Sequence, residues 1–216
     1  SLDEKMNFKA VIPARGGSKG IKKKNLVNFN GKPLIYWTVE HARESKKIDD
    51  FFISSEDDEI LSYAKKLGVK THERSKKLSS DSSTTLDLLI NLNSNPELVS
   101  DNYVILQPTS PLRQKNIIDK CIDEFIDKKY DCLATGFVCK NYEWGKTKNT
   151  GRQKLKGWFY DDGNIYILSK KLIDLGKWYD KNSGKYLQTF PWTNEIDTHS
   201  DLRVMEYIVK NLKDFL

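Results

Sequence analysis

The chain has 216 residues, of which 38% are hydrophobic, and its 36 basic and 30 acidic side chains give a net charge of +6. This apolar fraction can bury a sizeable core, which excludes wholesale disorder and favours one compact α/β unit. Basic and acidic residues are interspersed along the chain, so the excess of positive charge favours an anionic ligand only weakly. The sequence contains no run of about 18 apolar residues, and a membrane span is therefore not predicted.

Strand-like and helix-like segments alternate through the first half of the chain. The patterns predict strands at 8–13, 50–54, 69–73 and 103–107, and helices at 34–45, 59–67, 83–92 and 117–127. Pro33 and the acidic stretch 55–58 are typical of helix starts. Such alternation predicts a largely parallel sheet with helices on both faces, which binds ligands at the carboxyl ends of its strands.

The second half is less regular. We expect strands at 132–138 and 163–168, a short helix at 170–175, and a last helix at 201–212 that Thr198 or Ser200 could cap. Between them, the polar, glycine-containing segment 141–158 predicts a long loop or hairpin, where substrate contacts or a subunit interface could lie.

The stretch "IPARGGSKGIKKKN" at 12–25 directly follows the first predicted strand. Its glycines allow the backbone N–H groups to approach a ligand, and its cations supply fixed positive charge, as a triphosphate site requires. The glycines are Gly16, Gly17 and Gly20, and the cations are Arg15, Lys19 and Lys24. The spacing matches neither common nucleotide fingerprint, so the stretch by itself also fits a lysine-rich surface turn.

A second motif, "VILQPTSPLR" at 104–113, carries a strand into a turn held by two prolines. Because proline fixes φ, the turn would hold its polar side chains with little entropy to lose, although an ordinary capped turn has the same pattern. These side chains are Gln107, Thr109, Ser110 and Arg113.

Three cysteines, Cys121, Cys132 and Cys139, form no CxxC pair and have no histidine at metal-binding spacing. We therefore expect neither a disulfide framework nor a zinc site, and a reducing, cytoplasmic setting fits best. No leader pattern is visible, and with Met6 as the natural start, residues 1–5 would fit an expression remnant.

Together with "DDGNIYIL" and "EIDTHSDL", the two motifs resemble the cytidylyltransferases that make CMP-activated nonulosonic acids, typified by CMP-sialic acid synthetases. The resemblance implies one three-layer α/β domain over 6–216, of nucleotide-diphospho-sugar transferase type with a mostly parallel sheet. It also implies a homodimer with a small protruding dimerisation element, for which 141–158 fits. The implied reaction joins CTP to a 2-keto nonulosonic acid, releases pyrophosphate and needs Mg²⁺.

The resemblance also implies site residues. Those near CTP would be Ala14, Arg15, Gly16, Gly17, Lys19, Lys24, Asn25, Arg74, Ser80, Ser82, Ser83 and Thr84. Those near the sugar would be Gln107, Thr109, Ser110, Arg113, Lys146, Tyr160, Asp161 and Asp162. Arg15 and Lys19 suit the charge that grows on the leaving pyrophosphate, and Asp197 with Glu195 offers the oxygen ligands that Mg²⁺ prefers.

Two departures from the family pattern leave the sugar open. Glu195-Ile196-Asp197 stands where the family commonly has Asp-x-Asp, so Asp197 is the stronger metal ligand. Tyr160-Asp161-Asp162 replaces an Arg-Pro-Asn sequence that faces the acceptor in sialic acid enzymes. Sialic, legionaminic and pseudaminic acids all stay open, as does 3-deoxy-octulosonate or another sugar nucleotide reaction. Nucleic-acid binding is a remote alternative, since basic and aromatic residues are not interleaved, and neither a nucleic acid nor a membrane is an expected partner.

Overall fold

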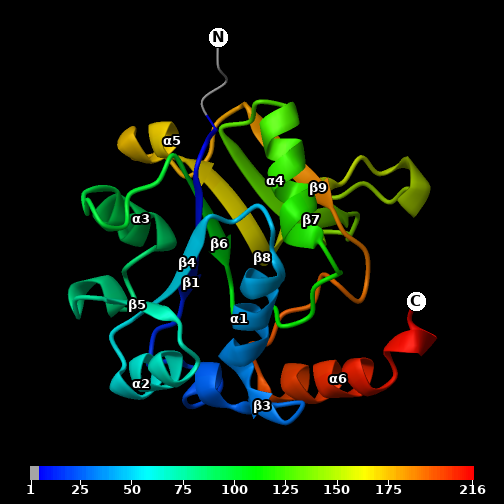
Figure 1. Cartoon of the computed structure of the whole chain (residues 1–216). Coiled ribbons are helices and arrows are strands. Elements are labelled where there is room, and N and C mark those ends of the chain that lie inside the picture. Colours follow the sequence, from blue (N-terminus) through cyan, green and yellow to red (C-terminus); the bar gives the residue numbers. More distant parts are fainter. Residues whose placement is uncertain (1–4) are drawn as a thin grey trace.

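The computed structural model describes residues 5–216, so most of the predicted remnant at 1–5 lies outside the described residues. Seven strands form one sheet in the order β5-β4-β1-β6-β8-β7-β9 (Figure 1). Their bounds are β1 Phe8–Pro13, β4 Asp50–Ser55, β5 Lys70–Glu73, β6 Asn102–Leu106, β7 Cys132–Cys139, β8 Trp158–Ser169 and β9 Ser183–Leu187. β8 is antiparallel to both neighbours, whereas the other pairs in this sheet are parallel. The predicted mostly parallel sheet is therefore confirmed.

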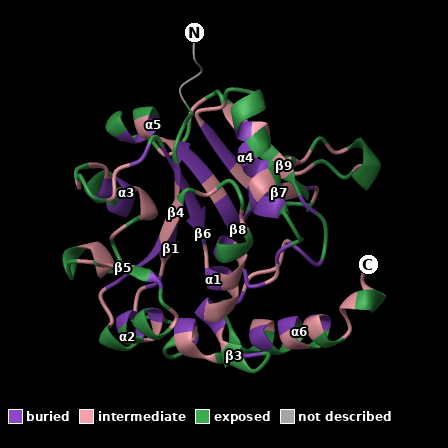
Figure 2. Cartoon of the chain, viewed as in Figure 1, coloured by how far each residue is buried: buried purple, intermediate pink, exposed green. Residues whose placement is uncertain are grey.

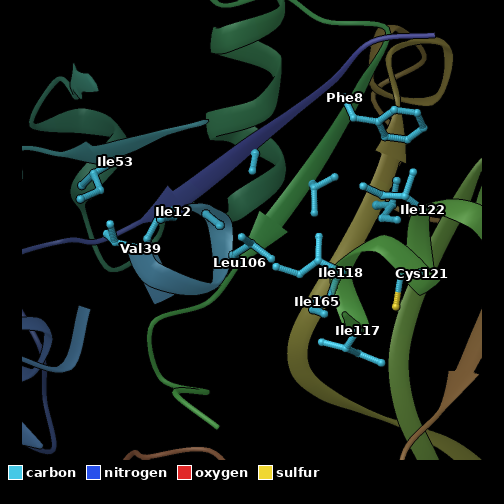
Figure 3. Close-up of a cluster of buried hydrophobic side chains, with 14 of the residues drawn as sticks. Phe8, Ile12, Val39, Ile53, Leu106, Ile117, Ile118, Cys121, Ile122 and Ile165 are labelled. Carbon is cyan, nitrogen blue, oxygen red and sulfur yellow. The ribbon is translucent and has the colours of Figure 1, made fainter. Parts of the chain in front are cut away.

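Helices cover both faces of the sheet and make three layers. One face carries α1 Leu34–Glu44, α2 Asp58–Lys66 and α4 Ile117–Asp127, and the other carries α3 Thr85–Asn93 and α5 Lys170–Asp174. Successive residues of a strand point to opposite faces, so Ile12 packs in the cluster beneath α1 and α4, shown in Figure 3, while Val11 packs beneath α3. The central strands are accordingly buried, and most exposed residues lie on helices and loops (Figure 2).

A third apolar cluster lies below the sheet and positions the end of the chain. It joins α6 His199–Lys210 to the hairpin of β2 Asn28–Phe29 and β3 Lys32–Pro33. Ile21 of the glycine-containing loop and Ile196 are both fully buried in this cluster. Residues on either side of Ile196 are thereby held beside the loop that follows β1.

Side-chain caps fix where four helices begin, and at α5 the Ser169 hydroxyl accepts from the N–H of Leu172. Asp57 accepts a hydrogen bond from the N–H of Ile60 at the start of α2, and Thr84 and Thr198 form capping boxes at α3 and α6. Thr198, not Ser200, is therefore the cap of the last helix. Short 3₁₀ helices complete the elements at Lys24–Leu26, Lys77–Ser79, Arg152–Lys154 and Leu212–Asp214.

Two features of the sheet differ from the sequence prediction. β9 was not predicted, because its short sequence SGKYL has only partial apolar alternation, and it pairs in parallel with β7 at the sheet edge. β8 begins at Trp158 instead of Gly163, and its pairing with β7 shifts register between Ala134 and Gly136. Gly163 adopts φ +71° opposite this irregularity. The irregularity divides β8 into two halves, and the sequence pattern predicted the first half as part of a loop and the second as a strand.

The segment 141–157 leaves the sheet between β7 and β8 and projects to one side (Figure 1). Its arrangement agrees with the predicted loop. Among the helices of the described residues, none is long and apolar enough to cross a membrane.

Candidate active site

Two adjoining cavities, of about 380 Å³ and 240 Å³, lie where β1 and β6 end. Both are lined by Pro13, Arg15 and Gln107. The parallel strands β5, β4, β1 and β6 bring their carboxyl ends to this same edge, which is where such sheets bind ligands.

The loop after β1 lines the larger cavity and supplies its cations. The other lining residues are Gly17, Ser18, Lys19, Gly20, Lys24, Asn25, Pro108, Thr109 and Asp197. The Asn25 side chain donates a hydrogen bond of 3.0 Å to the carbonyl of Arg15, which holds the loop closed on itself. The predicted nucleotide residues Arg15, Gly17, Lys19, Lys24 and Asn25 thus meet around one cavity.

None of the three glycines of this loop adopts the left-handed backbone, and close approach explains two of them, Gly16 and Gly20, whereas a Cβ on Gly17 would have open space. A Cβ on Gly16 would lie 2.4 Å from Oδ2 of Asp57, and one on Gly20 would lie 2.0 Å from the carbonyl oxygen of Asp197. The N–H of Gly16 donates to Oε1 of Glu56 at 2.6 Å, so it faces the protein instead of a ligand. Ala14 is also buried, at 1% exposure, and contact of Ala14 and Gly16 with the nucleotide stays a prediction.

The cations of the larger cavity are paired with two acids. Arg15 NH1 lies 3.0 Å and Lys19 Nζ 3.7 Å from the carboxylate of Asp81, and Lys24 Nζ lies 3.3 Å from that of Asp197. Ion pairs with exposed partners contribute little stability. A phosphate chain could therefore replace these carboxylates as the counter-charge.

The smaller cavity has hydroxyls and a second arginine. Its lining includes Arg74, Leu78, Ser80, Asp81, Ser83, Thr84, Thr85 and Leu88. Arg74 donates from Nε and NH2 to Ser54, at 3.0 Å in both cases, which fixes its orientation. Burial lowers the Arg74 pKa to about 10, although the negative charge of Glu56 acts to raise it. Ser82 lies outside this lining and pairs with the hydroxyl of Ser80 at 3.2 Å.

The proline-held turn divides its polar side chains between cavity and interior. Gln107 and Thr109 line the larger cavity, as predicted from the motif. Ser110 is fully buried and Arg113 is only 6% exposed, and neither lines either cavity at the sheet edge. The turn thus directs both side chains into the interior, and their contact with the sugar stays a prediction.

Carboxylates gather between the larger cavity and β8. Asp197 lines that cavity, and Glu195 lies beside Gly163, where a Cβ would stand 2.7 Å from Glu195 Oε2. Burial, with the nearby negative charges of Asp197, Asp161 and Asp162, raises the Glu195 pKa to about 7. A divalent cation would relieve this repulsion.

The donor set limits how such a cation could be held. Within the described part of the chain, no cluster of three or more His, Cys, Asp or Glu side chains is arranged to bind a metal. Two carboxylates completed by phosphate oxygens and water are what Mg²⁺ commonly uses, so Glu195 and Asp197 fit that ion.

The three residues before Gly163 take different directions. Asp162 is buried, and it accepts from Thr135 Oγ1 at 2.7 Å and from the N–H of Asn164 at 3.0 Å. Tyr160 stacks on Phe137, on the sheet face opposite to that of Asp161. Of this trio, Asp161 lines the cavity over β7, β8 and β9, and contact of Tyr160 and Asp162 with the sugar stays a prediction.

That third cavity, of about 140 Å³, lies over β7, β8 and β9 and was not predicted. Its walls include four aromatic rings and two opposite charges, from Phe159, Tyr166, Trp178, Tyr179, Asp161 and Lys185. Tyr166 donates to Asp161 at 2.6 Å and its ring centroid lies 5.1 Å from that of Trp178. Phe159 and Asp161 are two positions apart on β8, so the sequence could have indicated that they share a face of the sheet. No sequence pattern indicated that β9 and the loop before it complete the cavity.

Lys146 lies in the projecting segment. Its ammonium is 2.7 Å from the Glu143 carboxylate, and it lines neither cavity at the sheet edge. Its contact with the sugar carboxylate stays a prediction.

Comparison with known proteins agrees with this geometry. The family model described as "Cytidylyltransferase" matches residues 9–189. The chain belongs to this cytidylyltransferase family, and the fold and site define a nucleotidyltransferase.

Individual relatives refine the family. The chain is 37% identical to a pseudaminic acid cytidylyltransferase of Campylobacter jejuni subsp. jejuni serotype O:2, over 93% of this chain and 95% of that protein. It is 29% identical to the N-acylneuraminate cytidylyltransferase of Oncorhynchus mykiss, over 94% of this chain. The chain spans about half the length of that fish relative, with 50% of it covered.

Solved structures share the fold at low sequence identity. A CMP:2-keto-3-deoxy-manno-octonic acid synthetase complexed with CTP has a TM-score of 0.74 at 15% identity, covering 95% of this chain and 99% of that chain. A 4-diphosphocytidyl-2C-methyl-D-erythritol synthase has a TM-score of 0.69 at 13% identity, with 95% and 99% covered. These likenesses establish the fold, and the three-layer prediction is confirmed by them.

Proposed function

We propose that this chain activates a nine-carbon 2-keto sugar acid with CTP, giving the CMP-sugar and pyrophosphate. The observation that carries the proposal is the 37% identity to a pseudaminic acid cytidylyltransferase across almost the whole of both chains. Two cavities at the sheet edge, joined at Arg15 and Gln107, support it because they suit the two unlike parts of a nucleotide.

The triphosphate would lie in the larger cavity, where Arg15, Lys19 and Lys24 converge. The base and ribose would lie in the smaller cavity, against Arg74 and the hydroxyls at the start of α3. Binding would release Asp81 from Arg15 and Lys19, since the phosphates carry more negative charge than one carboxylate.

The transfer needs positioning more than covalent catalysis. The anomeric hydroxyl of the sugar attacks the α-phosphorus in line, an O–P bond forms, and the bond from the α-phosphorus to the β-phosphate oxygen breaks. The hydroxyl proton is released and pyrophosphate leaves. Arg15 and Lys19 would stabilise the charge that grows on the leaving group, which makes them catalytic residues in this proposal.

Magnesium would be held by Asp197 and Glu195 beside the larger cavity. When bound, it would neutralise phosphate charge and orient the phosphates. Lys24 lies 3.3 Å from Asp197 and would contribute a fixed charge at the same place. Burial and repulsion together raise the Glu195 pKa to about 7, and Glu195 would ionise more readily with the cation present because the repulsion would fall.

The aromatic cavity over β7, β8 and β9 would accept the sugar acid. Asp161 would link it to the carboxylates beside the larger cavity, because its charge helps to raise the Glu195 pKa and it accepts a hydrogen bond from the Tyr166 hydroxyl. Aromatic rings beside paired polar groups suit a sugar that carries acylamino or deoxy carbons, since rings pack against C–H groups. Pseudaminic acid is therefore the first substrate to test.

Two further expectations belong to the assembly and its setting. The projecting segment 141–157 would pair two copies of the chain, since its Trp144 is 99% exposed. A reducing, cytoplasmic compartment fits the three free, buried cysteines.

Pyrophosphate release with CTP and a panel of 2-keto acids tests the function. The panel contains pseudaminic, legionaminic and sialic acids together with 3-deoxy-octulosonate, and UTP and ATP replace CTP in parallel reactions. We expect CTP-dependent release with a nonulosonic acid. Release with 3-deoxy-octulosonate alone, or faster release with UTP or ATP, would contradict the proposal.

A further inference from the structure

We infer that Arg113 is a positioning residue. It fixes Gln107, which lies on the nucleotide side of the site, relative to the corner of β8 at Gly163 and Asn164. This corner lies beside Glu195. The inference rests on the proposed function, because it concerns transfer between two substrates held by different strands. Arg113 itself touches neither cavity at the sheet edge and acts through the residues that it holds.

The Arg113 guanidinium joins three elements of the fold. NH2 donates to the carbonyl of Gln107 at 2.9 Å and to that of Asn164 at 3.4 Å. NH1 donates to Thr38 Oγ1 of α1 at 2.9 Å and lies 3.2 Å from Nδ1 of His41. Burial and the Arg113 charge lower the His41 pKa to about 3, so the neutral ring can accept this hydrogen bond.

The two backbone carbonyls that Arg113 holds, those of Gln107 and Asn164, belong to the nucleotide side and the carboxylate side of the site. Gln107 lines both cavities at the sheet edge, and its N–H also donates to the carbonyl of Asn164 at 3.3 Å. Asn164 directly follows Gly163, the residue with φ +71° whose absent side chain leaves room for Glu195. A shift of this corner would therefore move the carboxylate side of the site relative to the nucleotide side.

A buried carboxylate holds the backbone of Asn164 from its N–H side. The N–H of Asn164 donates to Asp162 Oδ1 at 3.0 Å, while Gln188 Nε2 donates to Asp162 Oδ2 at 2.8 Å. The backbone of Asn164 is thus held through its N–H by Asp162 and through its carbonyl by Arg113. In the described residues no carboxylate lies within ion-pair distance of Arg113, so carbonyls, a hydroxyl and an imidazole hold the guanidinium.

Stability alone does not explain a buried arginine at this place. Replacing buried charges with apolar side chains of similar volume is often neutral or stabilising. A planar guanidinium, in contrast, can donate to several acceptors in fixed directions, which neither methionine nor the compact ammonium of lysine reproduces. The geometry therefore favours a role in alignment over a role in stability.

The test compares Arg113→Met and Arg113→Lys with the control Thr38→Val, using kcat and KM for CTP in the pyrophosphate assay. Thr38→Val removes a hydrogen bond of the same guanidinium on the side away from the substrates. We expect both Arg113 variants to lose kcat by about 100-fold, the loss that a misplacement of about 1 Å produces. The KM for CTP should stay within about threefold, because Arg15, Lys19 and Lys24 are unchanged. Thr38→Val should lower Tm and keep kcat within about twofold.

Three results would overturn the inference. One is a kcat near that of the wild type in either Arg113 variant, and another is a kcat that follows Tm equally in all three variants. The third is failure of both Arg113 variants to fold, which would make Arg113 a residue of the fold. A wild-type protein that releases no pyrophosphate with any nonulosonic acid would overturn the proposed function instead.

Discussion

The nucleotide edge and the β8 side of this molecule are built in different ways. At the nucleotide edge, Arg15, Lys19 and Lys24 come from one loop of the chain and reach open cavities with exposed partners. On the β8 side, Asp162 and its partners are buried and connect residues distant in sequence. A single loop of the chain can therefore supply the charges that bind a ligand. The shape of the acceptor site, in contrast, depends on hydrogen bonds and strand pairing between residues far apart in the sequence.

Loss of the Asp197 charge would break the link between the two regions, and it should have the largest effect. We expect Asp197→Asn to lower kcat by about 100-fold or more, because an amide lacks the negative charge that Mg²⁺ requires. Pyrophosphate release titrated with Mg²⁺ measures this loss. Asp127→Asn is the matched control, since Asp127 is an exposed acid at the end of α4 and lines neither cavity at the sheet edge. Near-normal turnover in Asp197→Asn would exclude its proposed role.

Removing one cation tests whether the loop supplies charge for the phosphates. Arg15→Met should lower kcat/KM for CTP by about 10- to 100-fold, as expected for one lost charge-assisted contact. Lys22→Met is the control, because Lys22 is an exposed lysine of the same loop and lines neither cavity. Equal effects of the two substitutions on kcat/KM and on its salt dependence would show that only the net charge of the loop matters.

An aromatic substitution on the β8 side should affect one substrate only. We expect Trp178→Ala to raise the KM for the sugar acid by about 10-fold, the effect of losing an aromatic contact of about 1 kcal/mol or slightly more. The KM for CTP should not change. Trp144→Ala, at a 99% exposed position of the projecting segment, is the control. A parallel rise of both KM values would refute the assignment of this cavity to the sugar.

The pH dependence of stability sharpens the comparison and should show the smallest effect. The folded pKa of Glu195 is raised from 4.5 to about 7, so the folded state binds the additional proton between these values. The free energy of unfolding should therefore fall as pH rises through this window without Mg²⁺, by about 1 kcal/mol once solvent screening is considered.

Thermal unfolding at pH 5 to 8 in the presence of a chelator measures this dependence. Glu195→Gln should flatten the decrease of Tm with pH, and Mg²⁺ should reduce it in the wild type. Identical pH slopes in the variant and the wild type would mean that burial does not perturb this carboxyl.

Local signals explain what could be predicted along the chain. The strand before Arg15 and the proline-held strand that ends at Gln107 were both predicted, and both residues line the cavities. Arg113 and Asp162 were expected on the sugar side because the family resemblance of their motifs implies it. Their burial depends on how β6 pairs with β8 and how β7 meets the irregularity at Gly136, which no local pattern encodes.

The sequence by itself determined the three-layer fold, the glycine-containing loop and the family, because strand and helix periodicity and contiguous motifs are local properties. Only the tertiary structure decided which polar side chains reach a cavity. It directed the Gly16 N–H to Glu56, buried Arg113 against Gln107 and Asn164, and assembled the aromatic cavity with β9. The physical reason is that a side chain's direction follows from strand register and from the partners that satisfy its polar atoms, and both depend on residues far away in the chain.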